Sequence, residues 1–548
     1  MLYNILKIHP NDNVLVALTD LKAGETVNYK GNEVSIRYDV PAKHKIAEAA
    51  LAPGEKIYMY GIIVGKALFP IAKGEVLTTQ NVAHQTAEYT GKRTDFQWSA
   101  PDVTKWKGKT FLGFHRPDGQ VGTANHWIVV PLVFCENRNV EIIKQAFVEE
   151  LGFEKPNPYK SYVRQMTALY TQGQRQEIQN LTIETAERHH ANKIFVNIDG
   201  IKFLTHQGGC GGTRQDSEAL CALIAGYIHN PNVAGATILS LGCQNAQASV
   251  LLEKLHKINP QHSKPVIILE QQQEGTEQAL LTKAIQETFM GLTEADQIQR
   301  QPAPLSKLTV GLECGGSDGF SGISANPAVG HASDLVVALG GKTILSEFPE
   351  LCGVEQELIN RCVSDETAER FVQLMRAYSA RAEAVGSGFD MNPSPGNIKD
   401  GLITDAMKSA GAAKKGGTSP ITDVLDYTEV AVKPGLNLLC TPGNDVESTT
   451  AMAASGCNII LFTTGLGTPT GNPVTPVIKV SSNSKLAEKM PDVIDIDTGS
   501  VIAGEKTIEQ MGEEILDYII EVASGNIIPK AVQLNQNDFI PWKRGVSL

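Results

Sequence analysis

Several common features are missing from this sequence of 548 residues. Its nine cysteines are an odd number and form no CxxC pair, which argues against a disulfide framework and a structural zinc site. No apolar run approaches the roughly 18 residues that span a bilayer, and the start, MLYNILKIHPNDNV, lacks the apolar stretch of a secretory leader. Basic residues are outnumbered, with 48 Lys and Arg against 60 Asp and Glu, so nucleic acids and anionic membranes are poor partners. We therefore expect a cytoplasmic protein with reduced thiols.

Nucleotide and metalloprotease motifs are also missing. The sequence has no GxxxxGK[ST] phosphate loop and no HExxH, which argues against NTP hydrolysis and a zinc protease. What remains is an ordinary globular composition, 42% apolar and 20% charged, with 50 glycines gathered mainly in short clusters. The length predicts two to four domains.

Three domains are predicted along the chain. Residues 1–90 hold β-rich runs and three similar turns, LKAGETV, LAPGEKI and IAKGEVL, which are typical of a small all-β domain. A polar linker follows at 91–108. Strand-like runs such as KIFVNI and PVIIL then alternate with helical stretches over 109–292, and after a polar gap the alternation returns over 307–548. This pattern predicts α/β domains with mainly parallel sheets, the last one Rossmann-like but without a GxGxxG fingerprint.

Polar residues follow the predicted strands of the last domain. ECGGSDG (313–319) follows the first strand, Glu347 the second, and TPGND (441–445) a third. Because ligands bind beyond the carboxyl ends of parallel strands, carboxylates and hydroxyls gathered there indicate a site for a hard divalent cation. Taken singly, such a turn is often only a tight connection, and such an acid is more often a helix cap. Their convergence on one sheet edge favours a real site.

The middle domain contains a second candidate site, THQGGCGG at 205–212. His206 lies four residues before Cys210 among glycines, and Cys243 follows another predicted strand. This arrangement suits a metal or acid–base site, although a lone His/Cys pair is usually structural.

Four longer motifs point to a family. LECGGSDGFSGISANPAVG (312–330), NPSPGN (392–397), TPGND (441–445) and FTTGLGTPTG (462–471) resemble the signatures of the altronate and galactarate dehydratases, and the similarity covers essentially the whole chain. The resemblance implies an N-terminal SAF (β-clip) domain, a middle α/β domain and a C-terminal Rossmann-like domain. It also implies a hydro-lyase that converts a sugar acid, by default D-altronate, to 2-dehydro-3-deoxy-D-gluconate with Fe²⁺ or Mn²⁺, in a homodimer.

The resemblance also implies the site residues. His44 and Lys45 would hold the substrate carboxylate, and His206 or Lys45 would transfer a proton. The expected catalytic residues are His44, Lys45, His206, Cys210, Glu313, Cys314, Lys408 and Lys415, and the expected metal ligands are Asp318, Glu347 and Asp445.

Some positions depart from the family pattern. Charged groups or proton carriers are replaced at Thr78, Gln80, Ala124, Gln244, Ile398 and Leu466. These changes indicate either a related lyase for another hydroxy acid, such as galactarate or sulfolactate, or a catalytically impaired relative that binds a sugar acid. If the substrate is still held by its carboxylate, other cations should line the cleft, and Lys43, Lys399 and Lys415 are the candidates. A site without any cation would indicate the impaired relative.

Overall fold

The computed structural model describes residues 4–155, 157–183 and 193–547. Its N-terminal part consists of short antiparallel strands arranged as β1-β2-β5, β3-β4 and β6-β7-β8. Their bounds are β1 Ile5–Leu6, β2 Val14–Ala17, β3 Thr26–Tyr29, β4 Asn32–Ser35, β5 Lys45–Ala47, β6 Lys56–Met59, β7 Ile62–Ala67 and β8 Val82–Ala83. The three predicted turns are confirmed, because Gly24, Gly54 and Gly74 share a φ near 80° that a side chain would disfavour.

The predicted linker is held against the C-terminal domain. The amide of Thr90 donates to Gln356 Oε1 and the amide of Arg93 donates to Asn360 Oδ1, both on helix α8 (Glu355–Arg361). The chain then enters a further antiparallel sheet, β10-β9-β15, with bounds β9 Thr110–His115, β10 Val121–Gly122 and β15 Arg300–Pro304. The polar gap predicted before residue 307 therefore includes a strand.

The middle domain is built on a parallel sheet in the order β12-β11-β13-β14. Its strands are β11 His126–Pro131, β12 Gly200–Phe203, β13 Val233–Ser240 and β14 Val266–Glu270, and its helices are α1 Asn137–Glu150, α2 Pro158–Thr171, α3 Arg214–His229, α4 Ala248–Ile258, α5 Gln271–Glu274 and α6 Glu277–Ala295. The prediction of a strand at KIFVNI (193–198) is wrong. Phe195 and Ile198 are buried in the core under the sheet from an irregular segment, so their apolar pattern reflects burial and not a strand.

The C-terminal domain has a seven-stranded parallel sheet in the order β18-β19-β17-β16-β20-β21-β22, which confirms the predicted fold class. The strands are β16 Thr309–Cys314, β17 Lys342–Leu345, β18 Ile421–Leu425, β19 Gly435–Leu439, β20 Ile459–Thr464, β21 Val477–Ser481 and β22 Ile496–Asp497. Its further helices are α7 Ala325–Ala338, α9 Asp365–Ala384, α10 Pro395–Lys399, α11 Asp405–Ala412, α12 Asp445–Ala454, α13 Ser484–Lys489, α14 Gly499–Ile502, α15 Ile508–Ala523 and α16 Lys530–Gln533.

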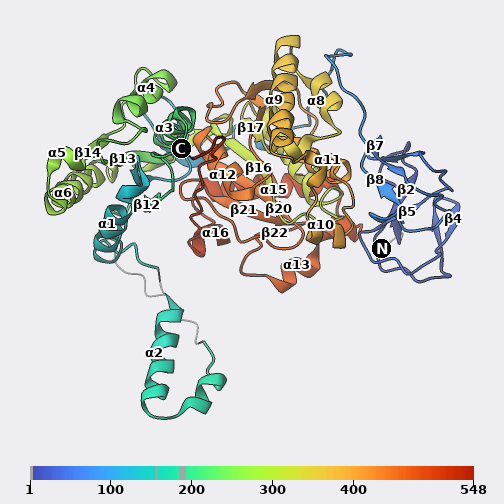
Figure 1. The fold of residues 1–548 in the computed structure, drawn as a ribbon, viewed down its shortest axis with the longest axis horizontal. Coiled ribbons are helices and arrows are strands. Elements are labelled where there is room, and N and C mark those ends of the chain that lie inside the picture. The colour runs from blue at the N-terminus through green and yellow to red at the C-terminus, as the bar shows by residue number, and fades with distance from the viewer. Residues whose placement is uncertain (1–3, 156, 184–192, 548) are drawn as a thin grey trace.

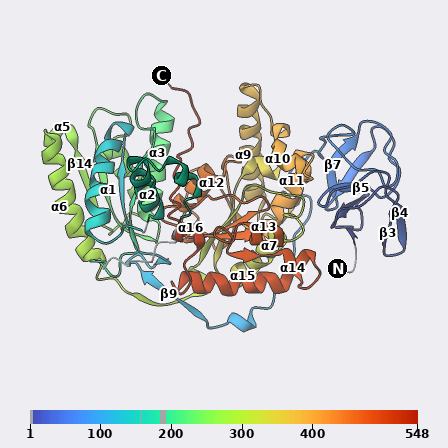
Figure 2. The same cartoon turned by 90° about the horizontal axis from the view of Figure 1, so that it is seen from below.

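Both faces of this sheet are buried. Along β20, Ile459 and Leu461 face the core that contains α7 and α15, while Ile460 and Phe462 face the core shared with α3 of the middle domain. Alternate side chains of a strand point to opposite faces, so the middle domain covers one face of the C-terminal sheet. The N-terminal domain packs at the other end of the molecule, beside α10 and α11 (Figures 1 and 2). Among the described helices, none is both long and apolar enough to cross a membrane.

Candidate active site and metal centre

An acidic cluster lies at the carboxyl edge of the C-terminal sheet. Glu313 and Cys314 end β16, Glu347 and Glu350 follow β17, and Asp445 begins α12. Their side chains form two overlapping groups, Cys314–Glu347–Glu350 and Glu313–Glu347–Asp445, and within each group the possible ligand atoms lie within 4.8 Å of one another. The parallel topology explains this convergence, because it turns the ends of β16 and β17 to the same edge.

Two carboxylate oxygens of the cluster have no hydrogen-bond partner among the described residues. Glu313 Oε2 accepts hydrogen bonds from Ser346 Oγ (3.0 Å) and Ser448 Oγ (2.6 Å), but Glu313 Oε1 and Glu347 Oε1 are buried and unsatisfied. Leaving such atoms unpaired is costly, and a cation bound between the carboxylates would satisfy both. The residues present therefore fit a divalent metal held by Glu313, Glu347 and Asp445.

The backbone at Glu347 is strained. Its φ of 65° and ψ of 64° place it in the left-handed region, which glycine adopts far more readily than glutamate. The conformation is held in part by a hydrogen bond from the Glu347 amide to Thr441 Oγ1 at 2.9 Å. Strain of this kind is concentrated at functional sites, and here it turns a carboxylate into the cluster.

Two lysines offset part of the negative charge. Lys415 Nζ lies 2.7 Å from Cys314 Sγ and 3.3 Å from Glu347 Oε2, and Lys408 Nζ lies 2.6 Å from Glu350 Oε1. Four carboxyl groups face two ammonium groups, so the fully ionised cluster would carry an excess of negative charge that a divalent cation would neutralise.

Burial and mutual repulsion shift the acids. Burial, reinforced by Glu350, raises the pKa of Glu347 to about 7, and burial beside Glu347 raises the pKa of Glu313 well above its ordinary value. Burial also acts on Glu350, but Lys408 and Lys415 outweigh it and lower the pKa of Glu350. Without a metal, this cluster therefore holds protons that a bound cation would displace.

The N-terminal domain supplies further cations. Lys43 Nζ lies 3.0 Å from Asp318 Oδ2 and 2.9 Å from Asp400 Oδ1. Lys45 Nζ donates to the carbonyl oxygens of Gly401 (2.7 Å) and Lys43 (3.0 Å), and burial lowers its pKa to about 7. Burial also acts on Lys43, but the charges of its two partners raise its pKa. One lysine is thus held protonated, and its neighbour loses its proton near neutral pH.

Asp318 belongs to neither group of clustered ligands. Its Oδ1 accepts hydrogen bonds from Ser321 Oγ (2.9 Å) and Ser482 Oγ (2.8 Å), and its Oδ2 accepts from Asn483 Nδ2 and pairs with Lys43. Both oxygens are thus occupied by protein donors. This geometry fits a positioning role toward Lys43, and the expected metal contact of Asp318 stays a prediction.

His206 and Cys210 lie at the carboxyl edge of the middle sheet, a different sheet from the one that carries the acidic cluster. The His206 Nε2 is 2.7 Å from the carbonyl oxygen of Pro131, and its Nδ1 accepts a hydrogen bond from the Gly208 amide. Both ring nitrogens are engaged by backbone, and burial lowers the pKa of the ring. These contacts fit a structural histidine, and the role of His206 in proton transfer stays a prediction. His44, half-buried in the N-terminal domain, has its Nδ1 3.3 Å from the Ala42 carbonyl.

Sequence reasoning missed Lys479, and it left Glu350, three residues after Glu347, out of the expected site residues. Lys479 lies in β21 and is fully buried, with its Nζ 3.5 Å from the centre of the Phe462 ring. Within the part of the chain that the structure describes, this Nζ has no hydrogen-bond partner. Burial lowers its pKa to about 7, against the charge of Asp445. The available signal was a single lysine within the mostly apolar strand VIKVS. A lysine in a buried strand is not a solvated surface charge, so its position called for another explanation.

The departures from the family pattern have different surroundings. The amide of Leu466, 38% exposed, donates to the Gly316 carbonyl in the loop before Asp318. Thr78 and Gln80 sit in a turn next to Leu77, whose amide donates to the Lys45 carbonyl. Half-buried Ile398 is in α10, and buried Gln244 braces the loop that follows β13. Ala124 precedes β11 and thus lies at the amino end of the middle sheet, away from its ligand edge.

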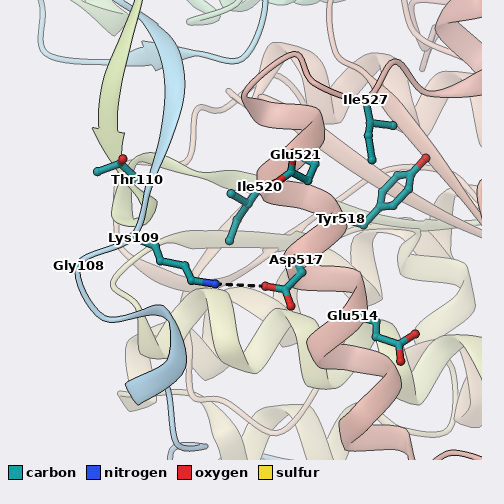
Figure 3. A pocket seen from close by; sticks show the side chains of 9 residues that line it. All are labelled: Gly108, Lys109, Thr110, Glu514, Asp517, Tyr518, Ile520, Glu521 and Ile527. Atoms are coloured by element: carbon teal, nitrogen blue, oxygen red, sulfur yellow. Dashed lines mark ion pairs between the residues drawn. The ribbon is translucent and has the colours of Figure 1, made fainter.

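Two surface pockets share no residue with the cluster. One, of about 660 Å³, lies between the end of the linker and α15, where Lys109 pairs with Asp517 (Figure 3). The other, of about 490 Å³, is lined by residues that include His331 and Arg361. Neither contains clustered candidate ligands, so the acidic cluster is the stronger site.

Comparison with known proteins yields three consecutive family matches. Residues 3–85 match the altronate/galactarate dehydratase SAF domain, residues 113–296 the second domain of D-galactarate dehydratase/altronate hydrolase, and residues 305–547 the C-terminal domain of D-galactarate/altronate dehydratase. The altronate dehydratase of Bacillus subtilis (strain 168) is 34% identical with both chains fully covered. That of Escherichia coli (strain K12) is 34% identical over 99% of each chain. Galactarate dehydratase (L-threo-forming) of Escherichia coli (strain K12) is 30% identical over 95% of this chain and 92% of its own.

Proposed function

The chain belongs to the D-galactarate/altronate dehydratase family, and on that premise we propose that it is a hydro-lyase that converts D-altronate to 2-dehydro-3-deoxy-D-gluconate. The observation that carries this proposal is the cluster of buried Glu313 and Glu347 with half-buried Asp445, which has two unsatisfied carboxylate oxygens and lies beside several lysines. The homodimer and the cytoplasmic location expected from the sequence stay predictions.

The proposed metal is Fe²⁺ or Mn²⁺, held by Glu313, Glu347 and Asp445. Oxygen donors favour a hard cation, and Cys314 at the margin of the cluster adds a sulfur that suits iron. Bound there, the metal would act as a Lewis acid toward negative charge that develops on the substrate carboxylate.

Dehydration requires a base for the C2 proton and an acid for the departing C3 hydroxyl. Lys45 Nζ is proposed as the base, because a pKa of about 7 leaves it able to accept a proton at neutral pH. Lys408 is proposed as the acid. Its interaction with Glu350 outweighs the effect of burial and raises the pKa of Lys408, so the side chain is held protonated. It would donate a proton to the hydroxyl, which leaves as water. The resulting enol gains a proton at C3 and loses the proton of its C2 hydroxyl, which gives the neutral 2-keto group of the product.

Lys43 is proposed to anchor the substrate carboxylate. Its side chain is held in place by Asp318 and Asp400 and is 19% exposed. The ammonium group is therefore fixed in position but still accessible to a substrate. Lys399, the alternative cation expected from sequence, is exposed on α10. The cations around the cluster favour an active enzyme over a relative that only binds a sugar acid.

The test is the reaction itself. Protein stripped with a chelator and reloaded anaerobically with Fe²⁺ or Mn²⁺ should form a 2-keto-3-deoxy acid from D-altronate, detected by mass spectrometry and a keto-acid assay. D-Galactarate in a parallel reaction tests the related substrate. Product from neither acid, with metal bound, would refute the proposed activity.

A further inference from the structure

We propose a second metal site, in the middle domain, where Cys135, Cys210 and Cys243 together bind an iron–sulfur cluster. Within the described residues these three are the exposed cysteines, while the other six are buried, and all nine are free thiols. Cysteine thiolates are the usual protein ligands of such clusters, and reactive cysteines are at least partly accessible.

The three cysteines follow three neighbouring strands. The middle sheet has the order β12-β11-β13, and all its pairings are parallel. Cys135 comes four residues after the end of β11, Cys210 seven residues after the end of β12, and Cys243 three residues after the end of β13. Parallel strands bring their carboxyl ends to one edge, so the topology gathers the thiols where ligands bind in such sheets.

Backbone hydrogen bonds connect the three loops. The amide of Phe134 donates to the Gly208 carbonyl at 3.1 Å, and the amides of Asn245 and Ala246 donate to the Gly209 carbonyl at 3.0 and 3.1 Å. Gly209 has a φ of 97°, and a Cβ there would lie 2.0 Å from the Leu132 carbonyl oxygen. Each cysteine is therefore within two residues of a hydrogen bond that ties its loop to another.

The spacing of the sulfurs argues against a single zinc ion. The three Sγ atoms do not all lie within 4.8 Å of one another, since they are in neither group that meets this limit. A single tetrahedral zinc ion, with Zn–S bonds of 2.3 Å, would bring its sulfurs to about 3.8 Å. In a [4Fe–4S] cluster each thiolate binds a different iron, which spreads the sulfurs farther apart. Three thiolates leave the fourth iron for water or another small oxygen ligand.

Two glutamines prepare the Cys243 loop. Gln272 Nε2 donates to Cys243 Sγ at 3.3 Å, and hydrogen bonds to sulfur tune iron–sulfur clusters. Gln244 accepts a hydrogen bond from the Gly242 amide at 2.7 Å and donates to Ser240 Oγ at 2.7 Å, which holds the turn that presents Cys243. The side-chain amide of Gln244 both accepts and donates a hydrogen bond in this loop. The loop is therefore ordered even though Gln244 departs from the family pattern.

The experiment uses the full chain, purified without oxygen and incubated with Fe²⁺ and sulfide. We expect about four irons and about four acid-labile sulfides per chain beyond the iron bound with Fe²⁺ alone, together with the broad visible absorption of a [4Fe–4S] cluster. Acid-labile sulfide separates this site from the carboxylate site, which binds no sulfide.

Single substitutions assign the ligands. Cys135→Ala, Cys210→Ala and Cys243→Ala should each lower the sulfide content at least tenfold, whereas Cys362→Ala, at a buried thiol, should retain it. Thermal unfolding of each protein before reconstitution checks that the fold is kept. Absence of labile sulfide in the parent, a single thiolate-bound ion in its place, or retention of the cluster in all three variants would overturn the proposal. Because the readout is sulfide content, loss of dehydratase activity leaves its result unaffected.

Discussion

The replacement Glu347→Gln should stabilise the metal-free protein at alkaline pH while removing its response to metal. Burial and Glu350 raise the pKa of Glu347 from 4.5 to about 7. The folded state therefore holds this proton more tightly than the unfolded state, and stability falls as pH rises through about 5 to 8. Fully ionised, the carboxyl costs about 3 kcal/mol of folding free energy, which the neutral amide avoids.

Urea unfolding at pH 5.5 and pH 8, with and without Mn²⁺, measures both effects. At pH 8 without metal the variant should be about 3 kcal/mol more stable than the parent, a difference that shrinks at pH 5.5. Mn²⁺ at a hundredfold excess over its dissociation constant should stabilise the parent by about 2.7 kcal/mol but leave Glu347→Gln nearly unchanged.

Glu355→Gln is the matched control. Burial also raises the pKa of Glu355 to about 7, but Glu355 lies outside both ligand groups and accepts a hydrogen bond from the Gly353 amide. This variant should gain similar stability at pH 8 and keep the full response to Mn²⁺. A Glu347→Gln protein that is less stable than the parent at pH 8 without metal, or that responds to Mn²⁺ as Glu355→Gln does, would refute the reasoning.

Three other substitutions separate the remaining roles. Because neutral Lys45 is the proposed base, kcat/KM of the parent should rise with pH through about 7 and then level off, whereas Lys45→Met should lose at least 100-fold in kcat and this rise. Asp318→Asn should keep its bound metal but raise KM about tenfold, because the substitution releases Lys43. Loss of the metal in a direct metal assay would instead show that Asp318 is a ligand. His206→Asn should lower thermal stability by about 1–3 kcal/mol and leave the pH profile of kcat/KM unchanged, because its ring nitrogens bind backbone; a shifted profile would contradict this role.

The parallel sheets could be predicted because their strands are short apolar runs that alternate with amphipathic helices. The convergence of Glu313, Glu347 and Asp445 followed from topology, since each lies at the carboxyl end of a strand or in the segment that follows it, and the strands run parallel. The failed strand at 193–198 shows the limit of this reasoning, because Phe195 packs into the same kind of core from an irregular segment.

Contacts between domains lay beyond sequence reasoning. Asp318 occupies a Gly-rich turn at the correct sheet edge, yet its oxygens are taken by Ser482, Asn483 and Lys43, which come from distant parts of the chain. The Lys43–Asp318 pair joins residues in different domains, and no local pattern encodes it. The sequence around His206 also gives no sign that both nitrogens of its imidazole ring form hydrogen bonds with the backbone.

The most direct test of a metal-dependent sugar-acid dehydratase is product formation by the chelator-stripped protein under anaerobic conditions. With D-altronate, the stripped protein should form no 2-dehydro-3-deoxy-D-gluconate, restored Fe²⁺ or Mn²⁺ should give the product, and Glu347→Gln should give none at the same metal concentration. Product at an equal rate in the stripped protein, or none from the fully metal-loaded parent, would contradict the role assigned to the buried carboxylates.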